Sequence, residues 1–377
     1  MTLEHYIRCG QKKLRCGYTT GTCAALAAAG AAALLLSGTK MEILSLVTPK
    51  GTRVETVPAY LFLDMETSVC GVMKDGGDDA DVTDGLIIEA HVKASGHPGI
   101  LIEGGEGVGR VTKPGLDQPV GFPAINRVPR RMIEEQVQRV CDDMGYEGGL
   151  EVRICIPNGR KAAKKTFNPM LGVEGGLSIL GTSGIVEPMS EKALVDTIEV
   201  ELRQAAAMGR KKLILTPGNY GETFLREHKV AGGAVSVVKC SNFIGDALDI
   251  ASTYPFAEVL LVGHIGKLVK LAGGVMNTHS RYADCRTELI CAYAAVCGAS
   301  REVCLALLQA ATTDACIEIL DGVHLRELVL EQLLAAIQTH LERRVQGKYR
   351  IGAVLFSNQY GLLGSTQPAR EIMESWK

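Results

Sequence analysis

The 377-residue chain has almost no net charge and no closely spaced pair of cysteines. Its formal net charge of −2 excludes a general nucleic-acid-binding protein, because such proteins are normally basic. Twelve cysteines are present, but neighbouring ones are never closer than six residues, so the C-x-x-C spacing of zinc and redox sites is absent. We therefore predict no protein metal site and expect most cysteines to be reduced, buried and apolar in behaviour.

The chain also lacks a long apolar run. No apolar segment of signal-peptide length stands at the N-terminus. Residues 23–36 form the richest apolar stretch, but they are too few and too rich in alanine to cross a bilayer. We expect a soluble, cytoplasmic protein with no membrane partner, and a homo-oligomer stays open as an alternative to a monomer.

Three common signatures of nucleotide and acyl chemistry are missing as well. The sequence contains neither a G-x-G-x-x-G dinucleotide fingerprint nor a G-x-S-x-G nucleophile elbow. A P-loop would need a glycine where Leu261 stands and a hydroxyl residue where Leu268 stands, on either side of Gly266-Lys267. Generic motifs therefore assign no function to this chain.

Glycine is what the sequence has in quantity, with 43 residues that cluster at the ends of apolar runs. The length favours two domains. Residues 1–170, with strand-like segments and helical patterns over 19–38 and 128–145, predict an α+β domain with a mostly antiparallel sheet. Residues 171–377 predict a Rossmann-like, doubly wound α/β domain with a helical insertion at 281–345.

The second domain repeats a plan of strand, glycine-rich loop and helix. The expected strands cover residues 177–180, 212–218, 234–240 and 258–262, and a last strand is expected at 350–357, after the helical segment. Because ligands bind outside the carboxyl ends of parallel strands, we expect the following loops to line one crevice. Glycine lets backbone N–H groups approach a ligand, and helix N-termini favour negative charge. The alternative is that each glycine only makes a tight turn.

One of these loops, "GHIGKLVKLAGG" at 263–274, carries ionisable side chains. Lys267 and Lys270 are three residues apart and share a helical face. Together with His264 they could hold carboxylates or move a proton. His279 is a similar candidate. The alternative is a capping histidine beside solvated lysines.

The first domain adds an acidic loop and several basic clusters. Residues 74–85 hold five aspartates, Asp78 among them, which could hold a metal or a cationic group but do not match the EF-hand register. Lys113, Arg127, Arg130 and the run at 160–165 would suit a polyanionic small ligand on a slightly acidic protein. In each case a solvated charged surface is the alternative.

Several longer stretches occur together in a fixed order. These are "RCGYTTGTCAA", "DGGDDADVT", "GVGRVTKPGL", "PAINRVPR", "LGTSGIVEPMS", "PGNYG", "SNFIG" and "GHIGKLVKLAGGVMNTHS". In this order the chain closely resembles the cobalt-precorrin-5B C(1)-methyltransferase family, densely over residues 14–285. Ala80 and Asp84 depart from the family's usual residues. The resemblance implies methylation of carbon 1 of cobalt-precorrin-5B to cobalt-precorrin-6A in anaerobic cobalamin biosynthesis, with S-adenosylmethionine as methyl donor and cobalt present only inside the corrinoid substrate.

Methyl transfer from a sulfonium needs positioning and water exclusion more than covalent help, so the missing catalytic triad is no objection. Under this resemblance we expect His264 and Asp78 to adjust the protonation of the macrocycle. The expected cofactor-binding residues are Gly181, Thr182, Ser183, Gly184, Pro217, Gly218, Asn219, Gly221 and Gly263. The expected substrate-binding residues are Thr19, Thr20, Lys113, Arg127, Arg130, Lys267, Lys270 and His279.

Two other functions remain open from the residues themselves. A nucleotide- or phosphate-dependent small-molecule transferase could use the same loops, and calorimetry with ATP against S-adenosylmethionine would distinguish it. A non-catalytic corrinoid-binding protein could keep the fold without turnover.

Overall fold

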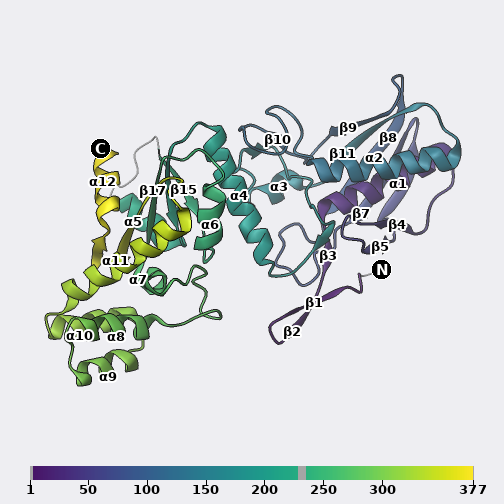
Figure 1. Ribbon diagram of the computed structural model, residues 1–377. Coiled ribbons are helices and arrows are strands. Elements are labelled where there is room, and N and C mark those ends of the chain that lie inside the picture. The colour runs from purple at the N-terminus through teal and green to yellow at the C-terminus, as the bar shows by residue number, and fades with distance from the viewer. Residues whose placement is uncertain (1–2, 228–234, 377) are drawn as a thin grey trace. The chain divides into compact units, whose positions relative to one another are not determined.

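The computed structural model describes residues 3–227 and 235–376 and divides the chain into two compact units, Met1–Glu191 and Lys192–Lys377 (Figure 1). The division falls after Glu191, beyond the boundary predicted at residue 170. The reason is that strand β12 (Val173–Glu174) pairs with β10 (Arg110–Val111), and β13 (Ile185–Val186) pairs with β3 (Gly17–Tyr18). Residues 171–191 therefore belong with the first unit.

A five-stranded sheet forms the first unit, in the order β6-β7-β8-β11-β9. The strands are β6 (Tyr60–Asp64), β7 (Thr67–Met73), β8 (Ile87–Ser95), β9 (Ile100–Gly104) and β11 (Gly149–Cys155). Every pairing is antiparallel except that of β11 with β9. This confirms the expected mostly antiparallel sheet. Two hairpins, β1 (Tyr6–Cys9) with β2 (Lys12–Arg15) and β4 (Leu44–Val47) with β5 (Arg53–Thr56), and the short helix α3 (Gly159–Ala163) complete the unit.

Helices α1 (Thr20–Ser37) and α2 (Arg127–Met144) pack side by side in this unit (Figure 1). The expected helix signals of α1 are confirmed: the Thr19 side chain accepts a hydrogen bond from the Thr22 N–H, and Gly38 ends the helix at φ 70°. By length and composition α1 could cross a membrane, but 78% of its apolar window is buried within the structure. Burial in the core accounts for its composition.

The second unit contains a sheet in the order β15-β14-β16-β17-β18. Its strands are β14 (Lys212–Thr216), β15 (Val235–Lys239), β16 (Glu258–His264), β17 (Arg350–Ser357) and β18 (Gly361–Ser365). The first four are parallel and β18 is antiparallel to β17. The chain therefore has the predicted α/β class.

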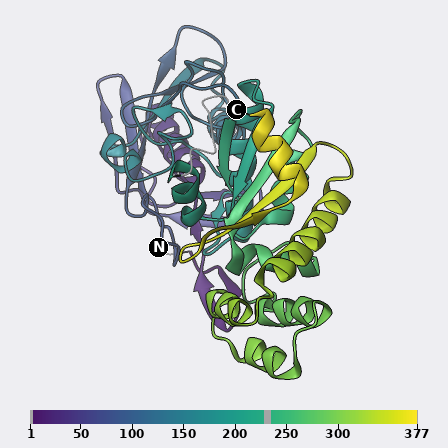
Figure 2. The ribbon, with the colours of Figure 1, turned by 90° about the vertical axis from the view of Figure 1, so that its left-hand side faces the viewer.

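Helices cover both faces of this parallel sheet. Ile214 packs with Phe224 and Phe356 in one apolar cluster, whereas its neighbours Leu213 and Leu215 pack in a larger one. Figure 2 shows the C-terminal helix α12, in yellow, over one face. The helices are α4 (Glu191–Ala207), α5 (Asn219–Glu227), α6 (Ile244–Ala251), α7 (Ile265–Leu268), the 3-10 helix η1 (Val269–Gly273), α8 (Arg286–Val296), α9 (Arg301–Gln309), α10 (Thr313–Gly322), α11 (Arg326–Val345) and α12 (Gln367–Ser375).

One predicted strand of this sheet was wrong. Residues 177–180 form no strand of the second unit; Leu177 and Ile179 make isolated bridges to Val108 and Ile125 in the first. The fourth parallel strand is instead β17, which confirms the last strand predicted at 350–357. The predicted helical segment before it contains α8 to α11.

Candidate functional site

The order of the parallel strands reverses between β14 and β16, which lie side by side. At such a reversal the loops leaving the two strands diverge and open a crevice at their carboxyl ends. The Lys267 ammonium bridges these loops by donating to the Pro217 carbonyl at 2.9 Å. We call this place the switch-point site; it brings together seven of the predicted residues, namely Pro217, Gly218, Asn219, Gly221, Gly263, His264 and Lys267.

Glycines in the switch-point site have two different roles. A β-carbon on Gly221 would overlap the Thr216 hydroxyl, and one on Gly263 would lie 2.9 Å from the side chains of Pro217 and Leu268. At Gly218 the backbone has φ +119°, and a β-carbon would meet nothing closer than the Lys267 ammonium at 3.8 Å. Gly221 and Gly263 are thus needed for packing, whereas Gly218 faces open space.

The buried Thr216 hydroxyl, at the end of β14, has no hydrogen-bond partner among the described residues. Buried polar groups are rarely left unpaired, so an orphaned hydroxyl at a strand end is a mark of a functional site. Asn219, one residue beyond Gly218, is fixed from the neighbouring strand: its side-chain oxygen accepts from Lys239 at 3.3 Å.

His264 has a defined tautomer. Its Nδ1 accepts the Gly266 N–H at 3.1 Å and so caps α7, which leaves the proton of the neutral ring on Nε2. The ring contacts Phe356 edge-on, with Tyr220 also nearby. Burial lowers the pKa of His264 below its ordinary value of 6.5, against the opposing charge of Asp314. At neutral pH the ring is therefore neutral, with Nδ1 occupied by the Gly266 N–H and the Nε2–H as its hydrogen-bond donor. Its expected role in adjusting the protonation of the macrocycle stays a prediction.

The two lysines of the loop differ, although the sequence spacing made them equivalent. Burial lowers the pKa of the half-buried Lys267. The Lys270 side chain is only 3% exposed, and its ammonium donates to the carbonyls of Thr278 (3.1 Å) and Ala283 (2.7 Å). Lys270 therefore fixes the 278–284 segment and is not available for a substrate.

The segment containing His279 lies at the same edge of the sheet. The Thr278 N–H donates to the Asn242 carbonyl at 3.0 Å, which ties this segment to the loop after β15. His279 is exposed, and its Nδ1 accepts the Arg281 N–H at 3.2 Å. It stays a candidate for contact with a ligand.

The "GTSG" loop at 181–184 lies in the first unit and follows no strand of the second unit's sheet. The Thr19 N–H donates to the Gly184 carbonyl at 3.0 Å, and the Thr20 hydroxyl accepts the Leu180 N–H at 3.0 Å. The Gly21 N–H, at the start of α1, donates to the Leu180 carbonyl. The prediction that this loop follows a strand of the same parallel sheet as 216–221 was wrong, because residues 177–180 form no strand of that sheet.

The glycines of this loop serve packing. At Gly181 a β-carbon would overlap Thr19, and at Gly184 it would lie 2.7 Å from Thr48. Ser183 both donates to and accepts from the backbone of Ile185, while Thr182 is exposed. Thr19 and Thr20 are buried. Thr19, Thr20, Gly181 and Gly184 pack together at the N-terminus of α1, so we do not include this loop in the proposed site.

The acidic loop is held by contacts inside the first unit. Asp75 accepts two hydrogen bonds from the Arg15 guanidinium, at 2.6 and 2.8 Å. Asp78 accepts the Arg15 N–H at 2.7 Å and is exposed. Asp81 pairs with the buried Lys74. Asp78 thus anchors the loop to Arg15, the last residue of β2, and it belongs to a different unit from His264.

The basic side chains of the first unit are partly engaged in its fold. Arg130 donates to the carbonyls of Ile125 and Ile102, both at 3.1 Å, and burial lowers its pKa. Lys113 donates to the Met170 carbonyl at 2.9 Å. Arg127 pairs with Asp117 but its side chain is 82% exposed, so of these three it is the cation most open to a ligand.

Family models match most of the chain. One described as CbiD matches residues 7–188, and one described as CbiD, C-terminal domain matches residues 277–367. The chain belongs to the CbiD family. The resemblance seen in the sequence is therefore confirmed. Neither CbiD model spans residues 189–276, in which most of the switch-point site lies, but full-length relatives do.

Three CbiD relatives are each named cobalt-precorrin-5B C(1)-methyltransferase. The protein of Ruminiclostridium cellulolyticum is 46% identical over 94% of this chain and 92% of its own length. Those of Moorella thermoacetica and Alkaliphilus metalliredigens are 44% and 41% identical and cover 97% and 100% of this chain and 98% of their own lengths. A crystal structure of the cobalamin biosynthesis protein CbiD from Archaeoglobus fulgidus is 29% identical, covers 74% of this chain and 87% of that chain, and has a TM-score of 0.41.

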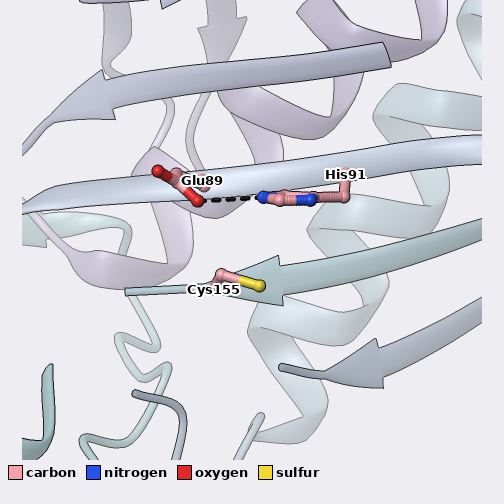
Figure 3. Close-up of side chains that lie close together, drawn as sticks. All are labelled: Glu89, His91 and Cys155. Carbon is pink, nitrogen blue, oxygen red and sulfur yellow. Dashed lines mark hydrogen bonds and ion pairs between the residues drawn. The ribbon is translucent and has the colours of Figure 1, made fainter. Parts of the chain in front are cut away.

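Sequence reasoning missed one further cluster of side chains in this CbiD chain. Glu89, His91 and Cys155 lie together on the sheet of the first unit (Figure 3). Cysteine spacing gave no hint, since Cys155 is distant in sequence from the other two. The alternating Glu-x-His pattern of an expected strand, which puts both side chains on one face, was the available signal.

Proposed function

We propose that this CbiD chain methylates carbon 1 of cobalt-precorrin-5B, giving cobalt-precorrin-6A in anaerobic cobalamin biosynthesis, with S-adenosylmethionine as methyl donor. The observation that carries the proposal is the 46% identity over nearly the whole length of a relative that bears this enzyme name. A cytoplasmic enzyme acting on a small corrinoid, without nucleic acid or membrane as partner, fits this function.

The second unit is in this proposal a Rossmann-like domain that binds the cofactor at the switch-point site. Support comes from the reversed strand order, the open space beside the Gly218 Cα and the unpaired Thr216 hydroxyl. S-adenosylmethionine supplies an electrophilic methyl group. The cofactor would lie against the open side of Gly218, whose N–H is already paired with the Thr216 carbonyl, and the His264 Nε2–H would orient it by a hydrogen bond. A bound ligand would also exclude water from the half-buried His264 and Lys267.

The protein's main contribution is positioning, because transfer of a methyl group from a sulfonium requires in-line approach. Corrinoid precursors are rimmed with carboxylates. Lys267, a half-buried member of the switch-point site, would bind one of these carboxylates. A charge-assisted hydrogen bond gains strength where water is partly excluded. Arg127 and His279 remain candidates for further carboxylates. Cobalt enters and leaves within the substrate.

Anaerobic turnover tests the function. The full chain is incubated with cobalt-precorrin-5B and methyl-labelled S-adenosylmethionine, and the macrocycle is analysed by mass. We expect a gain of one labelled methyl group, with no reaction when ATP replaces the methyl donor. A corrinoid that binds without gaining mass would reject the enzyme and favour a binding protein.

A further inference from the structure

Glu89, His91 and Cys155 converge from two neighbouring strands on one face of the first unit's sheet (Figure 3). Glu89 and His91 are two residues apart on β8, so their side chains share a face. Cys155 lies on β11 directly opposite Glu89 in the antiparallel register. One carboxylate oxygen, one ring nitrogen and the sulfur all lie within 4.8 Å of one another. Strands hold side chains more rigidly than loops, so this grouping is built into the fold.

The surroundings hold the three side chains in place. The Glu89 side chain is 16% exposed, His91 is 35% exposed and Cys155 is buried. The His91 Nε2 lies 2.9 Å from one Glu89 oxygen, and the Tyr60 hydroxyl donates to the other. A β-carbon on Gly105 would overlap the Cys155 sulfur, so the glycine leaves room for the thiol. The cluster is therefore oriented, partly shielded and still reachable from solvent through the His91 side.

The donor set selects a class of metal. Oxygen, imidazole nitrogen and thiolate sulfur together suit zinc and similar divalent transition metals, whereas calcium and magnesium require oxygen ligands. Zinc binds these donors at about 2.0–2.3 Å, which places the ligand atoms of a tetrahedral site roughly 3–4 Å from one another. Small side-chain rotations would close the observed grouping to that size.

We propose that Glu89, His91 and Cys155 bind a divalent transition metal of the zinc class, with water as the fourth ligand. The metal would take the place of the proton between the His91 Nε2 and the Glu89 oxygen. The ring proton would then sit on Nδ1, and the thiol proton would leave to solvent. Tyr60 would keep its hydrogen bond to the second Glu89 oxygen and orient the ligand. The site is independent of the proposed methyl transfer, whose cobalt belongs to the substrate.

Cobalt(II) is the probe, because a thiolate ligand gives it a charge-transfer absorption. The full chain, without corrinoid, is stripped with a chelator, kept reduced and titrated anaerobically with Co²⁺. We expect one ion per chain with a thiolate charge-transfer band, and loss of that band when Zn²⁺ is added in competition. Cys155→Ser should remove the band, and His91→Ala or Glu89→Gln should weaken binding at least tenfold. Tyr60→Phe should weaken it less.

Matched variants separate this site from other thiols and imidazoles. Cys141→Ser changes a buried cysteine of α2, and His97→Ala changes an exposed histidine after β8; both should keep the band and the affinity. The proposal is overturned if wild type shows no band, if the band survives in Cys155→Ser, or if the control variants lose as much as the cluster variants. Should Cys155→Ser fail to fold, by circular dichroism, the near-isosteric Glu89→Gln decides by its affinity.

Discussion

The loops at 181–184 and 216–221 are both rich in glycine, but their glycines have different surroundings. Both have glycines at positive φ, such as Gly184 at 79° and Gly218 at 119°. In the first loop the carbonyl of Gly184 accepts from the Thr19 N–H and the Thr22 hydroxyl. In the second, the Gly218 N–H donates to the nearby Thr216 carbonyl at 3.0 Å, and the space beside the Gly218 Cα is open. Glycines give both loops conformational freedom. The elements that pack around each loop determine whether its glycine is enclosed in the core, as Gly184 is, or borders open space, as Gly218 does.

The difference follows from what each loop meets. The first loop covers the N-terminus of α1, where unpaired N–H groups must find acceptors, and the Leu180 carbonyl supplies one. The second loop follows a parallel strand next to the order reversal, where diverging chains cannot pair with each other. The first of three predictions tests this contrast directly, and the other two test the residues proposed to act at the second loop.

The largest effect is expected from alanine at Gly184. A β-carbon there would lie 2.7 Å from Thr48, and the alanine would have to adopt the left-handed backbone conformation that Gly184 has. The free energy of unfolding should therefore fall by about 2–4 kcal/mol. The affinity of the remaining folded protein for S-adenosylmethionine should not change. Chemical denaturation and calorimetry measure the two quantities.

Gly218→Ala is the matched variant. Only backbone strain opposes it, about 1–3 kcal/mol, because a β-carbon there meets open space. Its affinity for S-adenosylmethionine should fall about tenfold, because the added methyl group would fill the open space that the cofactor is proposed to occupy. If Gly184→Ala lost cofactor affinity and Gly218→Ala did not, the assignment of the two loops would be reversed.

Local signals in the sequence predicted the elements well. Thr19 and Gly38 correctly bounded the helix, and the apolar runs before residues 217 and 264 are the neighbouring strands β14 and β16. Residues 177–180 misled, because a short apolar run reads the same whether it joins a sheet or makes isolated bridges. The partners of those bridges, Val108 and Ile125, are distant in sequence, so no local pattern could identify them.

The candidate site was predicted only in part for a similar reason. Spacing identified His264 and Lys267, which the structure places at the strand reversal. It could not show that the Lys270 ammonium donates to the Thr278 and Ala283 carbonyls, because those hydrogen bonds depend on how the 278–284 segment folds back over the loop. It missed the Cys155 cluster because strand register, and not cysteine spacing, brings that thiol to Glu89.

The second prediction contrasts the two lysines. Lys270→Met would leave the buried Thr278 carbonyl and the partly buried Ala283 carbonyl without their donor and would remove the ion pair with Asp284. It should lower the free energy of unfolding by about 1–3 kcal/mol, with little change in substrate affinity. Lys267→Met removes one hydrogen bond, to the Pro217 carbonyl, and also the ammonium proposed to bind a substrate carboxylate. Substrate affinity should therefore fall about tenfold, while stability changes less. Denaturation and corrinoid binding are measured on both. Equal behaviour of the two variants would show that the lysines share one role.

The smallest effect concerns the protonation of His264. Because burial holds its pKa below 6.5 in the folded protein, the neutral ring is favoured, and its contribution to stability should be present above pH 6.5 and lost as pH falls through the folded pKa. Protonation puts a hydrogen on Nδ1, which can then no longer accept the Gly266 N–H. We therefore expect the rate of methyl transfer to be independent of pH above neutrality and to decline on the acid side.

His264→Asn keeps a capping oxygen but lacks the Nε2 donor. The variant should therefore fold normally, lose several-fold in kcat/KM and no longer show the decline in rate at acid pH. Asp78→Asn, which can still accept the Arg15 N–H, should keep the wild-type profile. An activity that rises as the ring becomes protonated would instead make the imidazolium an acid in the reaction, and the capping hydrogen bond would then have to break during turnover.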